Sequence, residues 1–189
     1  MVVCAPSGSG KTSICRAYMR RDDHARYSIS LTTRPPRAGE IHGEDYKFVT
    51  EEEFAEAIEK DKLVEYEKVH DWMYGTPKSE IEDAIANGDR LLIDIDVKGG
   101  IEIKSKYPED TLTIFIKPPS VEELKKRLRG RGSESEEKIE RRLERYELEL
   151  SKANDFDVII KNDDFGKAVD QFSETINAQG GKTNGFRDH

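Results

Sequence analysis

The chain begins with a short apolar run that leads directly into a glycine-rich loop, and no other segment narrows the possible folds as much. Val2-Val3-Cys4 is followed by Ala5-Pro6-Ser7-Gly8-Ser9-Gly10-Lys11-Thr12. Apolar positions with helical spacing then run from Ser13 to Met19. A strand, a loop ending in Gly-Lys-Thr and a helix are the context of a phosphate-binding P-loop. The sequence therefore predicts a nucleotide-binding loop.

The residue types of this loop suit the chemistry of phosphate binding. Glycines 8 and 10 let backbone N–H groups approach phosphate oxygens, where a Cβ atom would obstruct them. The helix that opens at Lys11 directs its unpaired N–H groups and its positive dipole end toward the same anion. The Lys11 ammonium can reach the terminal phosphates, and the Thr12 hydroxyl is placed to ligate Mg²⁺.

One position departs from the usual motif, because Ala5 stands where the first glycine is expected. The alternative interpretation is a turn rich in glycine and serine before an ordinary helix. The strand before the loop and the helix after it favour the P-loop.

Length, charge and cysteine content limit the class of protein. The 189 residues suit one domain, and the net charge of −8 argues against a general binder of nucleic acid or anionic membranes. There is no apolar run as long as a membrane span and no signal peptide before the P-loop, so we expect a cytoplasmic protein. Cys4 and Cys15 fit reduced core residues better than a disulfide, and the histidines lack metal-ligand spacing.

Strand-like segments alternate with helical patterns, which predicts an α/β sheet covered by helices on both faces. The predicted strands are residues 27–31, 63–69, 90–97, 111–116 and 157–160. Helix starts are predicted at Thr50, Thr76-Pro77, Ser120 and Ser133, with a stop at Gly88. The last two starts open a helical pair, and residues 180–189 are expected to form a flexible tail.

A rigid basic loop follows the predicted strand at residues 27–31. Two prolines stiffen the segment that carries Arg34 and Arg37, and fixed guanidinium groups bind phosphate in bidentate fashion. A solvated basic turn is an equally good interpretation of this loop alone. Tyr46 and the Tyr74-Gly75-Thr76 turn add hydroxyl groups that can reach the same anion.

Three carboxylates stand in or at the end of apolar strands, where desolvation makes them costly without a partner. Alternation places Asp94 and Asp96 on one face near the end of a strand, and Asp94 is the candidate for Mg²⁺ or its water shell. Glu65 could accept two adjacent N–H donors of a base, although a solvated strand residue is the commoner role.

Arg131 sits in a glycine-flanked turn between two helices, which suits a lid over ATP.

The order of these motifs resembles guanylate kinase of the bacterial type, a nucleoside monophosphate kinase, from Val2 to about Ile176. The matching segments are 5–12, 28–40, 43–49, 74–76, 92–97, 115–120, 129–134 and 160–164. The Thr-Thr-Arg-Pro-Pro-Arg block with the downstream Tyr-Gly-Thr is far more specific than the P-loop. Lys98 and Gly100 depart from the family, which more often has glutamine and alanine there.

The resemblance implies transfer of the γ-phosphoryl group of MgATP to GMP, and also to dGMP, giving ADP and GDP. It implies a three-layer core of the P-loop NTPase type with a parallel sheet and two insertions. The expected boundaries are a core of 1–30, 81–119 and 151–179, a GMP-binding insertion of 31–80 and a lid of 120–150. Mg²⁺ is the expected cofactor, ATP and GMP are the expected small-molecule partners, and neither nucleic acid nor a membrane is expected.

The resemblance also assigns roles to particular residues. Those that hold the GMP phosphate would be Arg34, Arg37, Tyr46 and Tyr74. Those that read guanine would be Ser30, Glu65, Thr76 and Asp96. Those that bind ATP and its metal would be Ser7, Gly8, Ser9, Gly10, Lys11, Thr12, Asp94, Arg127 and Asn162. Catalysis would rest on Lys11, Arg34, Arg131 and Arg142.

Two other functions stay open at this stage. A guanylate-kinase-like protein-binding module without catalysis is disfavoured by the intact P-loop and Asp94. A related P-loop kinase with another phosphate-bearing acceptor is disfavoured by Glu65 and the Tyr-Gly-Thr turn, but only through their match to the guanine-reading pattern.

Overall fold

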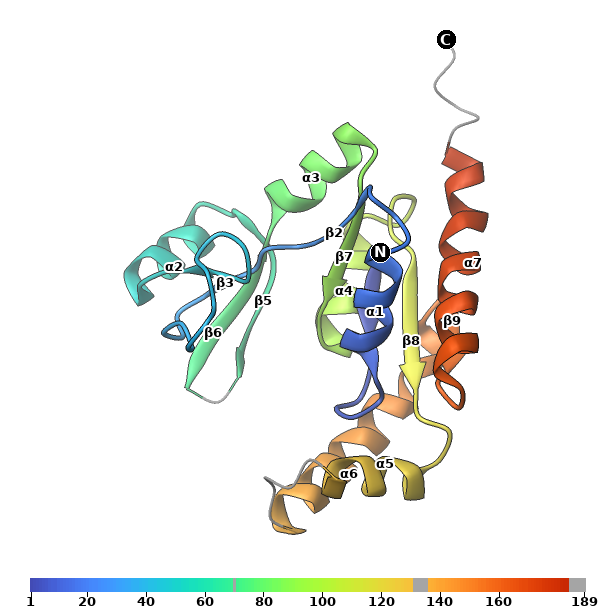
Figure 1. Ribbon diagram of the computed structural model, residues 1–189. Helices are drawn as coiled ribbons and strands as arrows, with labels where there is room; N and C mark the ends of the chain where they lie inside the picture. The colour runs from blue at the N-terminus through green and yellow to red at the C-terminus, as the bar shows by residue number, and fades with distance from the viewer. Residues whose placement is uncertain (70, 131–135, 184–189) are drawn as a thin grey trace.

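The computed structural model describes residues 1–69, 71–130 and 136–183, and its elements gather in three regions (Figure 1). A parallel sheet with helices on both faces forms the centre, and a smaller sheet stands beside it. A pair of helices lies at the lower end of the central sheet in this view. Residues of all three regions line a common cavity beside the P-loop.

Short apolar strands build the central sheet. Their order is β2 (Ala25–Tyr27), β7 (Arg90–Asp94), β1 (Val2–Cys4), β8 (Thr113–Lys117) and β9 (Val158–Lys161). All neighbours pair in parallel. Because both faces are covered, consecutive residues are apolar, and no residue of β1 is more than 1% exposed. The predicted α/β fold with a parallel sheet is confirmed.

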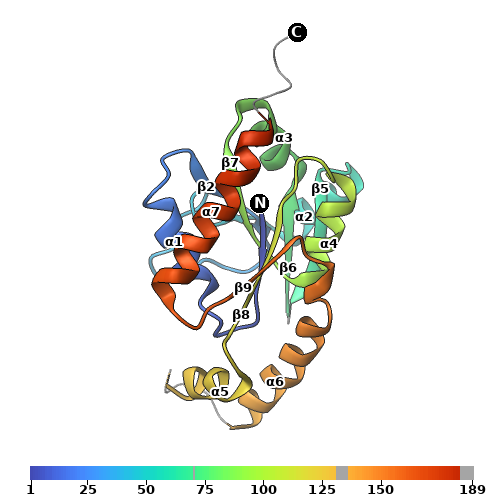
Figure 2. The same ribbon diagram turned by 90° about the vertical axis from the view of Figure 1, so that its right-hand side faces the viewer.

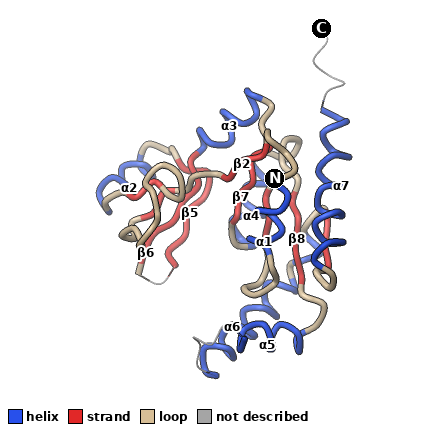
Figure 3. The backbone as a smooth tube through the Cα atoms, viewed as in Figure 1, coloured by secondary structure: helices blue, strands red, loops and turns tan. Residues whose placement is uncertain are grey.

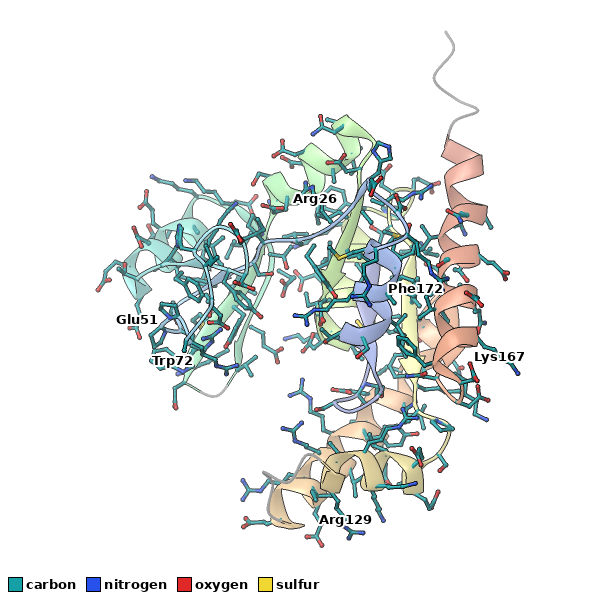
Figure 4. All side chains as sticks on the ribbon, in the orientation of Figure 1. Arg26, Glu51, Trp72, Arg129, Lys167 and Phe172 are labelled. Carbon is teal, nitrogen blue, oxygen red and sulfur yellow. The ribbon has the colours of Figure 1, made fainter. Side chains whose placement is uncertain are left out.

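Four helices cover the two faces of this sheet (Figure 2). One face carries α1 (Lys11–Met19) and α7 (Phe165–Thr183), and the other carries α3 (Lys78–Asn87) and α4 (Val97–Lys106). Val3 packs toward α1 and α7, whereas Val2 packs toward α3 and α4. Phe172 of α7 points toward α1 and meets Tyr18 edge to face, with ring centroids 5.4 Å apart (Figure 4).

Residues 31–77 contain a second sheet, which we call the inserted sheet (Figure 3). Its strands are β4 (Lys47–Phe48), β3 (Leu31–Thr32), β6 (Trp72–Pro77) and β5 (Leu63–Val69), in that order. Helix α2 (Glu51–Glu59) packs on it through a small core of Phe54, Ala57 and Leu63. Strands β5 and β6 are antiparallel, with Glu65 opposite Thr76.

Two further helices form what we call the helical arm. They are α5 (Val121–Gly130) and α6 (Glu136–Ser151), and the 3₁₀-helix η1 (Ala153–Asp155) follows them. The arm has a hydrophobic core of its own, formed by Leu124, Leu128, Ile139 and Tyr146. It therefore packs largely on itself.

Three of the predicted helix boundaries are confirmed and one is wrong. Thr50 and Glu53 form a complete capping box, the Ser120 hydroxyl accepts from the Glu123 N–H at 3.1 Å, and Gly88 ends α3 in the left-handed region. The cap at Thr76 is wrong, because Thr76 belongs to β6 and Pro77 precedes the first residue of α3. Ser133 lies outside the described residues.

The predicted strands at 111–116 and 157–160 correspond to β8 and β9, which are shifted by one or two residues. The strand at 63–69 is confirmed, but the strand at 90–97 ends at Asp94 because a helix absent from the prediction, α4, begins at Val97. The strand at 27–31 is divided between β2 and β3, which belong to different sheets. Helix α7 continues through Thr183, into the segment expected to be a tail.

Cys4 and Cys15 are buried and unpaired in the core, as predicted. Over the described ranges, the helices are too short or too polar for any of them to cross a membrane.

Candidate active site

A cavity of about 930 Å³ opens between the P-loop, the inserted sheet and α6. It brings together predicted site residues that are up to 135 positions apart in the chain, such as Ser7 and Arg142. The predicted residues that line it are Ser7, Gly8, Gly10, Lys11, Thr12, Ser30, Tyr46, Glu65, Tyr74, Thr76, Asp94, Asp96 and Arg142. The predicted residues outside its wall are Ser9, Arg34, Arg37, Arg127 and Asn162. Arg131 lies outside the described residues.

The P-loop backbone has the conformation that its glycines permit. Gly8 and Gly10 both have φ of +92°, a region that side chains with a Cβ rarely occupy. A Cβ on Gly8 would lie 2.9 Å from Leu124 Cδ1 of the helical arm, and one on Gly10 would lie 2.4 Å from Asn162 Nδ2. Glycine is therefore required here by backbone conformation and by the close approach of two neighbours.

Asn162 supports the loop from behind. Its side-chain amide donates to the Ser9 carbonyl at 2.7 Å and is buried. The backbone carbonyl of Asn162 accepts a hydrogen bond from the Arg127 guanidinium at 3.3 Å. The Arg127 guanidinium also binds the Glu123 carboxylate at 3.1 Å. In this conformation, Asn162 and Arg127, which are both predicted to bind ATP, hold the P-loop against the helical arm.

Lys11 and Asp94 form an ion pair on the cavity wall. Burial lowers the pKa of Lys11, but the adjacent Asp94 carboxylate outweighs it, so that the pKa is raised and the ammonium stays charged. The Lys11 ammonium also lies 3.5 Å from the Ile95 carbonyl oxygen. Thr12 is exposed at the start of α1. The Lys11 ammonium thus lies beside the Asp94 carboxylate and the Ile95 carbonyl oxygen at the N-terminus of α1.

Arg34 is buried and held by its own loop rather than solvated. Its guanidinium binds the Glu40 carboxylate in bidentate fashion at 2.9 Å for each contact, and donates to the Pro35 carbonyl at 2.8 Å. The hydrogen bond from Arg34 lowers the pKa of Glu40. The Arg34 side chain also lies 5.5 Å from the Tyr46 ring. The Arg37 side chain is exposed, so the predicted phosphate pair differs in environment.

Glu65 is 7% exposed, which rules out the solvated strand residue that was its commoner interpretation. A β-bulge between Leu63 and Glu65 interrupts the alternation of β5, so that residues 63–65 are all buried. The Thr76 hydroxyl donates to Glu65 Oε1 at 2.5 Å. Burial raises the pKa of Glu65. A buried carboxylate facing a cavity has strong reason to bind donors from a ligand.

Asp96 was predicted to lie on the strand that carries Asp94, but this prediction is wrong because the strand ends at Asp94. Asp96 is the N-cap of α4, where Oδ1 accepts from the Gly99 N–H at 2.8 Å. The same carboxylate accepts a hydrogen bond from Glu67, which also lines the cavity. This bond, together with burial, raises the pKa of Glu67 to about 7. Sequence reasoning missed Glu67, although its position two residues after Glu65 signals the same face of a strand.

Helix α6 contributes the third wall. Arg142 donates to the Ser7 hydroxyl of the P-loop. One turn further along α6, Arg145 binds Glu149 at 2.8 Å and lies 4.0 Å from Asp96 Oδ2. Arg145 and Glu149 also line the cavity and were not predicted. Arg145 follows Arg142 by three positions and Glu149 follows Arg145 by four, which places all three on one helix face. This spacing is the signal that could have found them.

Known sequences similar to this chain are guanylate kinases. Residues 1–179 match the family model for guanylate kinase. The guanylate kinase of Chlorobaculum tepidum is 44% identical over 176 residues, covering 93% of this chain and 90% of that protein. The guanylate kinase of Caldanaerobacter subterraneus subsp. tengcongensis is 41% identical over 179 residues, covering 95% and 86%.

Solved structures give the same picture. The crystal structure of guanylate kinase from Anaplasma phagocytophilum superposes with a TM-score of 0.74 at 30% identity, covering 95% of this chain and 84% of that one. Shikimate kinase from Bacteroides thetaiotaomicron superposes with a TM-score of 0.52 at 13% identity, covering 93% and 96%. The second likeness concerns the fold alone.

Proposed function

Because the chain belongs to the guanylate kinase family, we propose that its cavity transfers the γ-phosphoryl group of MgATP to GMP, and to dGMP, giving ADP and GDP. The observation that carries this proposal is one cavity with Lys11 of the P-loop on one wall and the buried pair of Glu65 and Thr76 on another. The first wall suits a polyphosphate, and the second suits a base with N–H donors.

The donor half binds ATP through backbone and cationic groups. N–H groups of Gly8, Ser9 and Gly10 and the N-terminus of α1 surround the phosphates, and Lys11 reaches the group in transfer. Arg142, already bonded to Ser7, supplies a second positive charge from the helical arm. The arm acts as the lid, closing on the microsecond to millisecond scale typical of such segments. Closure excludes water from the phosphoryl group.

The residues that would hold Mg²⁺ are Thr12 and Asp94. Their hydroxyl and carboxylate oxygens are the hard ligands that this ion prefers, and Asp94 is already paired with a cation in the cavity. Across the described residues, no three side chains of His, Cys, Asp or Glu converge into a metal cage. Thr12 and Asp94 would share the ion with nucleotide phosphates and water. When bound, it neutralises charge on the phosphates.

The acceptor half recognises guanine by the chemistry of Glu65. Guanine presents a ring N–H beside an amino group, and one carboxylate can accept from both, whereas adenine lacks that pair. Thr76 holds Glu65 in place, and Ser30 and Asp96 complete the base site. The GMP phosphate is held by Arg34, Arg37, Tyr46 and Tyr74. Arg34 must then share its guanidinium between Glu40 and the phosphate.

No general base is needed for this reaction. The acceptor is a phosphate oxygen that is ionised near neutral pH, so the chain's contribution is alignment and charge stabilisation. The buried thiols of Cys4 and Cys15 fit the cytoplasmic location that we also propose.

The test is a coupled assay of ADP release with MgATP and, separately, GMP, dGMP, AMP, UMP or CMP. We expect turnover with the two guanine nucleotides only. Turnover with another monophosphate would keep the kinase and remove the role given to Glu65. Binding of GMP without turnover for any acceptor would instead favour a protein-binding module.

A further inference from the structure

Three charged side chains from the three regions of the molecule converge at one end of the cavity. Glu67 comes from β5 of the inserted sheet, Asp96 from the start of α4 in the core, and Arg145 from α6 of the helical arm. All three line the cavity. Arg145 Nη2 lies 4.0 Å from Asp96 Oδ2, and the Glu67 and Asp96 side chains interact with each other.

The carboxylates in this cluster need a cation. When Glu67 is ionised, its carboxylate and that of Asp96 repel each other, and Glu65 and Glu149 lie on the same wall. Arg145 is the cation directed at Asp96 from the arm, and its interaction with Glu149 at 2.8 Å fixes the guanidinium there. Lys98 is exposed on α4, and its positive charge lowers the pKa of Glu67. The incoming GMP is itself an anion, so the charge balance of this wall matters for binding.

The fold does not depend on this cluster. The Arg145 side chain is 57% exposed, and exposed ion pairs contribute little to stability. Asp96 is anchored independently by the Gly99 N–H. Arg145 can therefore be removed without unfolding α6, whose own core is formed by other residues.

We propose that Arg145 is a positioning residue for the acceptor nucleotide: it bridges from the helical arm to Asp96 and Glu67, offsets their charge, and draws the arm and the inserted sheet together around GMP. This inference rests on the proposed function, because it assigns the acceptor half to GMP. Arg145 acts through the two carboxylates and does not touch the reacting phosphates. It should therefore affect use of GMP and spare use of ATP.

The decisive experiment is a double-mutant cycle of Arg145→Ala and Glu67→Gln at pH 8, where Glu67 is ionised in the wild type, read as KM and kcat for each nucleotide. In the wild-type background, we expect Arg145→Ala to raise the KM for GMP about five- to tenfold, with the KM for ATP changed less than about twofold. In the Glu67→Gln background, the same change should raise the KM for GMP less than about twofold, because one of the two carboxylates is then neutral. Arg145→Lys, which keeps the charge, should restore most of the lost affinity.

Two controls separate a positioning role from a structural one. Lys152→Ala removes one positive charge from an exposed residue just after α6 and should leave both KM values unchanged. The melting temperature of Arg145→Ala should stay within about 2 °C of the wild type.

Three results would overturn the inference. They are an equal rise of both KM values, the same effect of Arg145→Ala in both backgrounds, and a large fall in melting temperature. Absence of GMP turnover in the wild type would be a different failure, since it would reject the proposed function itself.

Discussion

The donor and acceptor halves of the cavity are built in opposite ways. The proposed donor half is built mainly on one continuous segment, residues 5–12, whose backbone is held by glycine conformation and by Asn162. The acceptor half draws side chains from β5, β6, the start of α4 and the loop that carries Arg34. Those side chains now bind one another: Arg34 binds Glu40, Thr76 binds Glu65, and Glu67 binds Asp96.

This difference has a consequence for binding. Backbone groups of the P-loop are ready for a phosphate without rearrangement, because the loop satisfies its own geometry before any ligand arrives. Charged side chains of the acceptor half must exchange a protein partner for a ligand. Specificity should therefore reside in the acceptor half, where a wrong base leaves buried groups unpaired, and rate should reside in the donor half.

The largest expected effect tests the donor half. Lys11→Met removes the cation nearest the P-loop phosphates, and turnover should fall by about 10²–10³ or more, as for other preorganised electrostatic contacts. The fold should persist, which circular dichroism and thermal melting can show. Lys60→Met, at an exposed residue after α2, is the matched control and should keep full turnover. Near-normal turnover of Lys11→Met would remove Lys11 from the mechanism.

The next effect tests the acceptor half. Glu65→Gln keeps the shape and the bond to Thr76 but replaces one acceptor with a donor, which would face the guanine N–H groups. The kcat/KM for GMP should fall about 10- to 100-fold, while the KM for ATP should change less than about twofold. Glu59→Gln, on the exposed side of α2, serves as the control. Equal damage to both nucleotides would show that Glu65 is structural.

A third effect sharpens the contrast between backbone and side chains. Gly10→Ala combines left-handed backbone with a Cβ 2.4 Å from Asn162 Nδ2, and should lower the free energy of unfolding by about 2–4 kcal/mol. Gly88→Ala has a similar backbone, with φ of +73° and nothing within 4 Å, and should lower it by only about 1–2 kcal/mol. Urea unfolding measures both. Equal losses would mean that Asn162 yields without cost.

The smallest expected effect concerns pH. Glu67 has a pKa of about 7 in the folded chain and 4.5 as its ordinary value, so the folded state holds more protons between these values. Stability should therefore be greatest below pH 4.5, as far as this group is concerned, and should fall as the pH rises through 7. Melting temperatures from pH 5 to pH 8 should fall less steeply for Glu67→Gln than for the wild type. Glu147→Gln, at an exposed residue, should follow the wild type.

Features that depend on local interactions could be predicted from the sequence. The P-loop, the capping box at Thr50, the stop at Gly88 and the strand at 63–69 each follow from residues adjacent in the chain. Family motifs extended this to most residues of the cavity wall. The motifs work because a fixed fold brings the same positions together, even though the spacing alone does not show how.

Long-range packing set the features that could not be predicted from the sequence. Two adjacent glycines made 97–106 a poor candidate for a helix, yet α4 forms there and packs closely, since a Cβ on Gly100 would lie 2.9 Å from Cys4 Sγ. That helix ends the strand at Asp94 and turns Asp96 into a cap. Asn162 lies behind the P-loop, and Glu67 meets Asp96, through contacts that span 153 and 29 positions. Propensity is a local quantity, whereas these contacts depend on which sheet faces and helix ends the packed core brings together.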